Sequence, residues 1–179
     1  MATSRHQKVL RVVLAALFLA LAYVLPFATG QIPRIGNLLC PMHLPVLLCG
    51  FLCGFLCGWY WGLTVGFVAP LFRSLTLGMP ILFPGATCMA FELATYGLVA
   101  GLLLRFLPRR RLNTYIALIV AMIAGRLVWG AAMAICLGIS DGALTLQAFM
   151  ASALINAIPG IVIQLVAVPL IVERCRDLV

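Results

Sequence analysis

Only 9% of the 179 residues are charged and the mean hydropathy is +1.19, so most of this chain is too apolar to face water. The net charge of +8 does not indicate a nucleic-acid partner, because a phosphate-binding patch needs a solvated face and nearly all cations lie outside long apolar runs. These runs are continuous rather than alternating, which excludes a β-barrel and predicts an all-α membrane protein. Residues 1–179 have room for a single domain.

Six transmembrane helices are predicted, because a bilayer core takes roughly 20 apolar residues per helix. The predicted spans cover residues 9–28, 43–57, 61–77, 86–106, 115–137 and 146–172. Segment 58–62 divides an apolar run that is about twice as long as one span needs. Its two glycines permit a tight turn, and its Trp and Tyr side chains prefer the membrane interface.

The cations gather on one side of these spans, at residues 5–11, 105–111 and 174–176. The loops on the other side hold little charge beyond Arg34 and Asp141. Since Lys and Arg stay on the cytoplasmic side, both termini are predicted to be cytoplasmic (N-in/C-in) in a multi-pass protein. The basic start followed by an apolar run is similar to a signal peptide, but the later spans favour a retained first helix.

Small residues repeat along the second predicted span. Gly50, Gly54 and Gly58 recur at every fourth position with a stripe of cysteines beside them, a pattern typical of close helix packing. The alternative is that these cysteines bind metal ions along a path. One helix face cannot supply all the ligands of a tetrahedral site, so no metal is expected. The seven cysteines, Cys88 and Cys136 among them, are predicted to be reduced packing residues rather than a disulfide framework.

Polar groups inside the predicted spans are the main functional candidates, because burying them in lipid is costly. Glu92, Arg126 and Asn156 lie at similar depths on three spans, and Arg73 lies nearer the outer face. Two interpretations remain open for Glu92 and Arg126. They either form a structural pair that joins two spans, or they orient a polar solute in a pocket in the outer half of the membrane.

Further candidates lie around this set. Tyr96 and Trp129 fall about one helical turn from Glu92 and Arg126, where they could form apolar walls. His43 begins the second span at the outer interface, and Asn37 lies in the loop before it.

No enzyme chemistry is predicted. Lys8 is the only lysine and precedes the first span, so no Walker A lysine exists. Neither His-Glu-x-x-His nor Gly-x-Ser-x-Gly occurs. No cofactor is expected in this chain, and the energy for any pumping must come from a gradient or another polypeptide.

An ordered set of short motifs runs along almost the whole chain. It comprises Ala16-x-x-x-Ala20, His43-Leu44-Pro45-Val46, the glycine series that ends in 58–62, residues 65–71, Gly78-Met79-Pro80, residues 89–97 and Gly125-Arg126. In these motifs, its size and its layout, the chain resembles the substrate-binding S components of energy-coupling factor (ECF) transporters, the vitamin importers of bacteria and archaea.

The resemblance implies an S-component-like bundle in a prokaryotic plasma membrane. It implies a vitamin pocket in the outer half, closed by the loop 34–41. Ala16 and Ala20, with Ala15 and Ala22 adding to the same small-residue face, would dock on a transmembrane coupling (T) subunit carried by two ABC ATPases, which would hydrolyse the ATP.

The substrate is predicted from charge. The outer half carries Arg34, Arg73 and Arg126 against Glu92, which favours an anionic vitamin such as pantothenate. Glu92 could instead recognise an amine or ring nitrogen, as in a thiamine precursor, a benzimidazole or a queuosine-like base.

Two other functions compete with this interpretation. A self-sufficient secondary transporter or channel would use Glu92 as its proton-coupling group, but the two halves of the chain show no convincing repeat. An integral-membrane enzyme or purely structural subunit is disfavoured, because a nucleophile or metal set is lacking.

Overall fold

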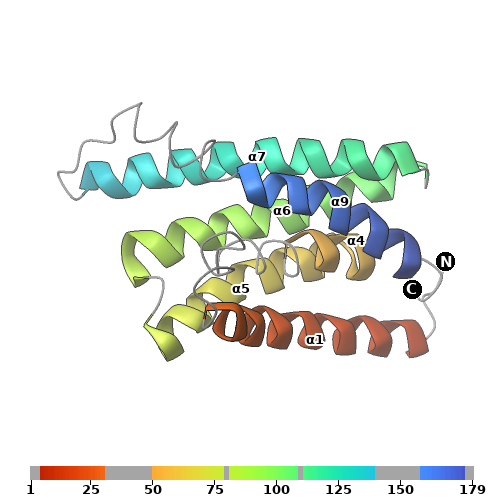
Figure 1. The fold of residues 1–179 in the computed structure, drawn as a ribbon, viewed down its shortest axis with the longest axis horizontal. Coiled ribbons are helices and arrows are strands. Elements are labelled where there is room, and N and C mark those ends of the chain that lie inside the picture. The colour runs from red at the N-terminus through yellow and green to blue at the C-terminus, as the bar shows by residue number, and fades with distance from the viewer. Residues whose placement is uncertain (1–4, 31–49, 79–80, 109–110, 140–157, 176–179) are drawn as a thin grey trace.

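The computed structural model describes residues 5–30, 50–78, 81–108, 111–139 and 158–175, and all regular structure within these ranges is helical. The long helices run alongside one another, with α1 and α7 at opposite edges in the view of Figure 1. In chain order the helices are α1 (Arg5–Gly30), α4 (Cys53–Cys57), α5 (Trp59–Leu77), the short π-helix η2 (Leu82–Ala86), α6 (Thr87–Phe106), α7 (Arg111–Ile139) and α9 (Ile158–Cys175).

The predicted spans agree with these helices wherever the structure describes them. Spans 9–28, 61–77 and 115–137 lie within α1, α5 and α7, and span 86–106 matches α6 to within one residue. For the other two, residues 43–49 and 146–157 lie outside the described residues. The all-α prediction is confirmed for the described ranges.

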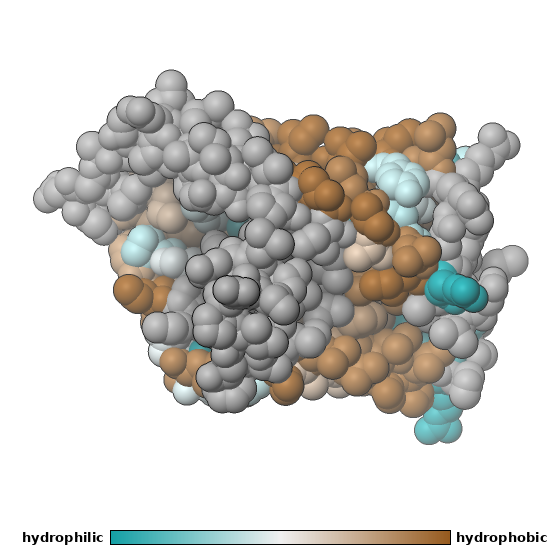
Figure 2. Space-filling model, viewed as in Figure 1, coloured by the Kyte–Doolittle hydropathy of each residue, from teal (hydrophilic) through white to brown (hydrophobic). Residues whose placement is uncertain are grey.

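Within the described residues, three helical segments are long and apolar enough to cross a membrane, namely Gln7–Val24, Leu82–Phe106 and Leu112–Cys136. Hydrophobic residues dominate the described part of the face shown in Figure 2. Large apolar side chains such as Val13 on α1 and Leu127 on α7 are more than half exposed. Such an apolar exterior is stable against lipid tails, so these segments fit an integral membrane protein.

Three helices meet at glycines. A Cβ atom added to Gly62 on α5 would lie 2.7 Å from the Cα of Gly54 on α4 and 2.9 Å from the Cα of Gly97 on α6. These distances leave no room for a side chain, so the close approach of the three backbones depends on glycine. The predicted packing role of Gly54 is confirmed.

The turn between α4 and α5 is made by Gly58 alone, which has a φ of 100°. A Cβ on Gly58 would have no atom within 4 Å, so its role is conformational rather than one of packing. Gly62, which the sequence assigned to this turn, lies inside α5 instead. That assignment was wrong because glycine serves both turns and close helix contacts, and only the neighbouring helices distinguish the two uses.

Replacing Gly97 with Val is expected to lower the free energy of unfolding by about 3 kcal/mol. A Cβ at this position would lie 2.3 Å from the backbone carbon and oxygen of Gly62, and backbone atoms cannot move aside without separating α5 from α6. Thermal unfolding of the detergent-solubilised protein measures the effect. The matched control is Ala131→Val on the exposed side of α7. Equal unfolding midpoints for the two variants would contradict the close backbone contact between α5 and α6.

Candidate functional site

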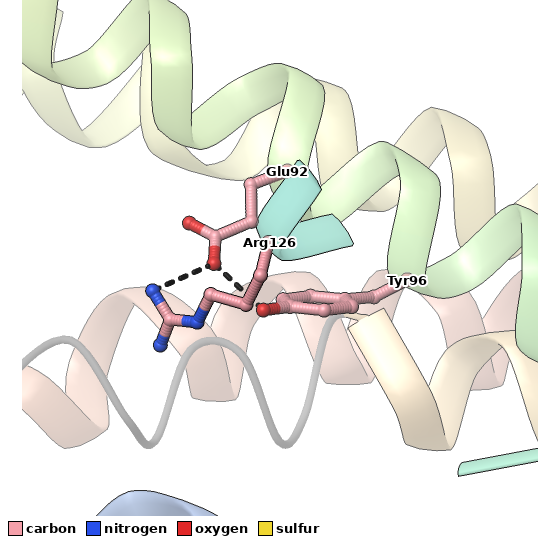
Figure 3. Close-up of polar contacts among 3 residues, drawn as sticks. All are labelled: Glu92, Tyr96 and Arg126. Carbon is pink, nitrogen blue, oxygen red and sulfur yellow. Dashed lines mark hydrogen bonds and ion pairs between the residues drawn. The ribbon is translucent and has the colours of Figure 1, made fainter. Parts of the chain in front are cut away.

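Glu92 is the centre of a polar cluster that joins α6 to α7. Its side chain is 2% exposed, and its Oε1 atom lies 3.1 Å from Nη1 of Arg126 on α7. The same oxygen accepts a 2.6 Å hydrogen bond from the hydroxyl of Tyr96, one turn further along α6. Figure 3 shows the three side chains converging on that oxygen. The predicted pairing of Glu92 with Arg126 is therefore present.

The two contacts of the cluster do not involve all of its polar atoms. Both contacts are made by one carboxylate oxygen of Glu92, and no interaction is drawn to the second oxygen or to the second terminal nitrogen of Arg126 (Figure 3). The Arg126 side chain is 30% exposed, whereas Glu92 is almost fully enclosed. A guanidinium carries five donors in a planar fork, and one ion-pair contact occupies a small part of that capacity.

Glycine and aromatic packing hold Tyr96 in place. A Cβ on Gly125 of α7 would lie 2.3 Å from Cε1 of the Tyr96 ring, so α7 approaches this ring closely only because residue 125 lacks a side chain. The ring of Phe51 also packs against Tyr96, with the two ring centroids 4.8 Å apart. Residues 125 and 126 thus act together, since Gly125 accommodates the tyrosine while Arg126 pairs with the carboxylate. The motif Gly125-Arg126 did not by itself predict this role of Gly125, because the contact depends on how closely α7 approaches α6.

Trp129 lies beside the polar cluster rather than in it. It is buried on α7 and packs against the buried Cys88 of α6, which is one turn before Glu92. Ala132, Met133 and Cys136 complete this apolar group. The prediction that Trp129 supplies an apolar wall near Arg126 is compatible with this position.

Of the remaining predicted binding residues, the structure describes Arg73, which lies half-buried on α5. Asn37, His43 and Asn156 lie outside the described residues, as does the loop 34–41. Within the described part of the chain, no group of three or more His, Cys, Asp or Glu side chains could hold a metal ion.

The small-residue face of α1 is narrower than predicted. Ala16 and Ala20 are exposed, as a docking surface requires. Ala15 and Ala22 are 3% exposed and belong to the apolar core, so their assignment to the same face was wrong. The helical period explains this, because positions 15 and 22 share the inward face with Phe18 while 16 and 20 point outward.

An apolar helical bundle with an enclosed ion pair, one member of which is partly exposed, is typical of membrane proteins that handle a polar solute. The family model for the ECF transporter substrate-specific component matches residues 10–172, and the chain belongs to this family. It is a substrate-binding membrane subunit of an ECF transporter and not an enzyme, as the motifs in the sequence indicated. Among curated proteins and solved structures, none matches the chain significantly.

Proposed function

We propose that Glu92, Tyr96 and Arg126 form the polar wall of the substrate site, and that Arg126 binds the carboxylate of a small vitamin such as pantothenate. The observation that carries this proposal is the single-oxygen contact between Arg126 and Glu92, combined with the 30% exposure of the arginine side chain. A purely structural pair gains most from two parallel hydrogen bonds between the guanidinium and the carboxylate. Here the guanidinium keeps donors for a second carboxylate.

The other candidate binding residues complete the proposed site from neighbouring segments. Arg73 and Trp129 would approach from α5 and α7, Asn37 and His43 from the first loop and the start of the second span, and Asn156 from the sixth span. The net excess of cations in this set supports an anionic solute. The amine or ring-nitrogen ligands that Glu92 could accept remain the competing substrate class.

The proposed topology is a single domain of six spans with both termini in the cytoplasm of a prokaryote. It is supported by the cations at residues 5–11, 105–111 and 174–176, which this topology places on one side of the plasma membrane. The Glu92–Arg126 pair would then lie in the outer half of the bilayer, where a vitamin arriving from outside could reach it.

Delivery of the vitamin is proposed to depend on partners. Ala16 and Ala20 would dock on the T subunit, which two ABC ATPases carry and energise. Their exposure on α1 supports this role, because small residues on an accessible helix face let another helix approach closely.

A second candidate function is secondary transport with Glu92 as the proton-coupling group. The enclosure of Glu92 between α6 and α7 favours it, since buried carboxylates serve as proton relays in transporters. Uptake by the purified protein in liposomes, driven by a proton gradient without nucleotide, would support this candidate, and absence of such uptake would favour the S-component mechanism.

A thermal-shift screen of the purified protein against a panel of vitamins tests the proposed substrate class. A ligand at about 100 times its Kd stabilises the folded state by about 2.7 kcal/mol, which raises the unfolding midpoint by roughly 5 to 10 °C. A carboxylate vitamin is expected to give this shift and its neutral analogue is not. Stabilisation by cationic vitamins only would contradict an anionic substrate and assign recognition to Glu92.

A further inference from the structure

Two thiols from distant parts of the chain meet at one end of the α6–α7 contact. Cys88 is the second residue of α6, and Cys136 lies near the end of α7. Their positions differ by 48 residues, yet the sulfur atoms are 3.7 Å apart and Cys88 donates a hydrogen bond to Cys136. Neither cysteine forms a disulfide in the structure, so both are thiols.

The two thiols differ in accessibility. Cys88 is fully buried in the group that includes Trp129, whereas Cys136 is partly exposed. Cys136 is therefore the more accessible residue of the pair, and the sulfur of the buried Cys88 lies within 3.7 Å of its sulfur. This arrangement suits a reaction in two steps, in which the exposed thiol is modified first and the buried thiol resolves the product.

We propose that Cys88 and Cys136 are a redox-active pair that closes to a disulfide by exchange with a small-molecule disulfide. The Cys136 thiolate attacks that disulfide, which forms a mixed disulfide and releases one small thiol. The Cys88 thiolate then attacks the Cys136 sulfur and releases the second small thiol. The protein loses two protons and two electrons, and the small disulfide gains them as two thiols.

The geometry permits closure. A disulfide joins two sulfurs about 2.05 Å apart, so the pair must approach by about 1.7 Å from its present 3.7 Å. Closure would link α6 covalently to α7, the helices that carry Glu92 and Arg126. The thiol pair does not depend on the proposed substrate, because no ligand takes part in the exchange.

A second cysteine pair supplies an internal comparison. Cys53 and Cys57 lie one turn apart on the same helix, α4, and their exposed fractions are 0% and 2%. Neither sulfur is accessible to a reagent from solution. We therefore expect this pair to stay reduced under conditions that oxidise Cys88 and Cys136.

The test incubates the full chain in detergent micelles with the small neutral reagent bis(2-hydroxyethyl) disulfide, alkylates the remaining thiols, and maps tryptic peptides by mass spectrometry. Cleavage after arginine places Cys88 on peptide 74–105 and Cys136 on peptide 127–174, each with no second cysteine, while Cys53 and Cys57 share peptide 35–73. The expected product joins 74–105 to 127–174. The oxidised protein should unfold roughly 5 °C or more above the reduced protein, and a reducing thiol should reverse both changes.

Single substitutions test the order of attack. In Cys88→Ser, Cys136 should hold a stable mixed disulfide with the reagent, whereas in Cys136→Ser, Cys88 should remain unmodified. The matched control, Cys53→Ser with Cys57→Ser, should cross-link like the wild type. Recovery of both thiols alkylated in the wild type, a stable mixed disulfide on wild-type Cys136, or a link from Cys88 to another cysteine would each overturn the proposal.

Discussion

Replacing Arg126 with Gln is expected to weaken binding of the carboxylate vitamin at least tenfold, which corresponds to about 1.4 kcal/mol. Gln is neutral and offers two donors at one amide nitrogen, so it cannot form the charge-assisted contact that a guanidinium makes with a carboxylate. Titration of the purified protein with the vitamin measures the change in Kd.

The Arg126 variant needs controls, because removing the cation leaves Glu92 enclosed without its charged partner. Two further variants avoid leaving a single unpaired charge at positions 92 and 126. Arg126→Lys retains the charge but not the planar fork, and Glu92→Gln combined with Arg126→Gln removes both charges together. We expect both variants to fold and to bind the vitamin more weakly than the wild type. Wild-type affinity in the doubly neutral variant would leave the pair with a structural role only.

Substitution of Ala16 or Ala20 by Trp is expected to reduce transport more than tenfold while Kd for the vitamin stays within about twofold of the wild type. Both alanines are exposed on α1 and neither belongs to the core, so a Trp side chain there obstructs a docking helix without disturbing the ligand cluster. Uptake of labelled vitamin by cells that also express the T subunit and the ATPases measures transport, and titration of the purified variant measures binding.

The matched control for docking is Ile123→Trp on α7, whose side chain is 58% exposed. It adds the same bulk to an apolar exterior elsewhere in the bundle and should transport normally. Normal transport by either alanine variant, or an equal loss in the α7 control, would remove Ala16 and Ala20 from the docking surface.

The sequence predicted the parts of the fold that depend on local pattern. Apolar run length located α1, α5, α6 and α7, because the hydrocarbon thickness fixes how many residues a span needs. The Glu92–Arg126 contact was also predictable, since two opposite charges at similar depth in lipid favour pairing.

Contacts between distant segments were harder to predict. Tyr96 was expected as an apolar wall, but its hydroxyl donates to Glu92, and its ring fits against the bare backbone of Gly125. Cys88 and Cys136 were predicted to be packing residues, and no local pattern in the sequence indicates that their sulfur atoms lie close together. Each of these contacts depends on the separation and rotation of α6 and α7, which periodicity along one helix does not fix.

The most direct test of the central claim compares two ligands on two proteins. The ligands are the vitamin that stabilises the wild type and an analogue whose carboxylate is replaced by a neutral amide or alcohol, and the proteins are the wild type and Arg126→Lys. If the guanidinium holds the carboxylate, the wild type will prefer the vitamin over the analogue at least tenfold, and this preference will shrink strongly in Arg126→Lys. Equal preferences in both proteins would show that the carboxylate is recognised elsewhere, and the account of the site would be wrong.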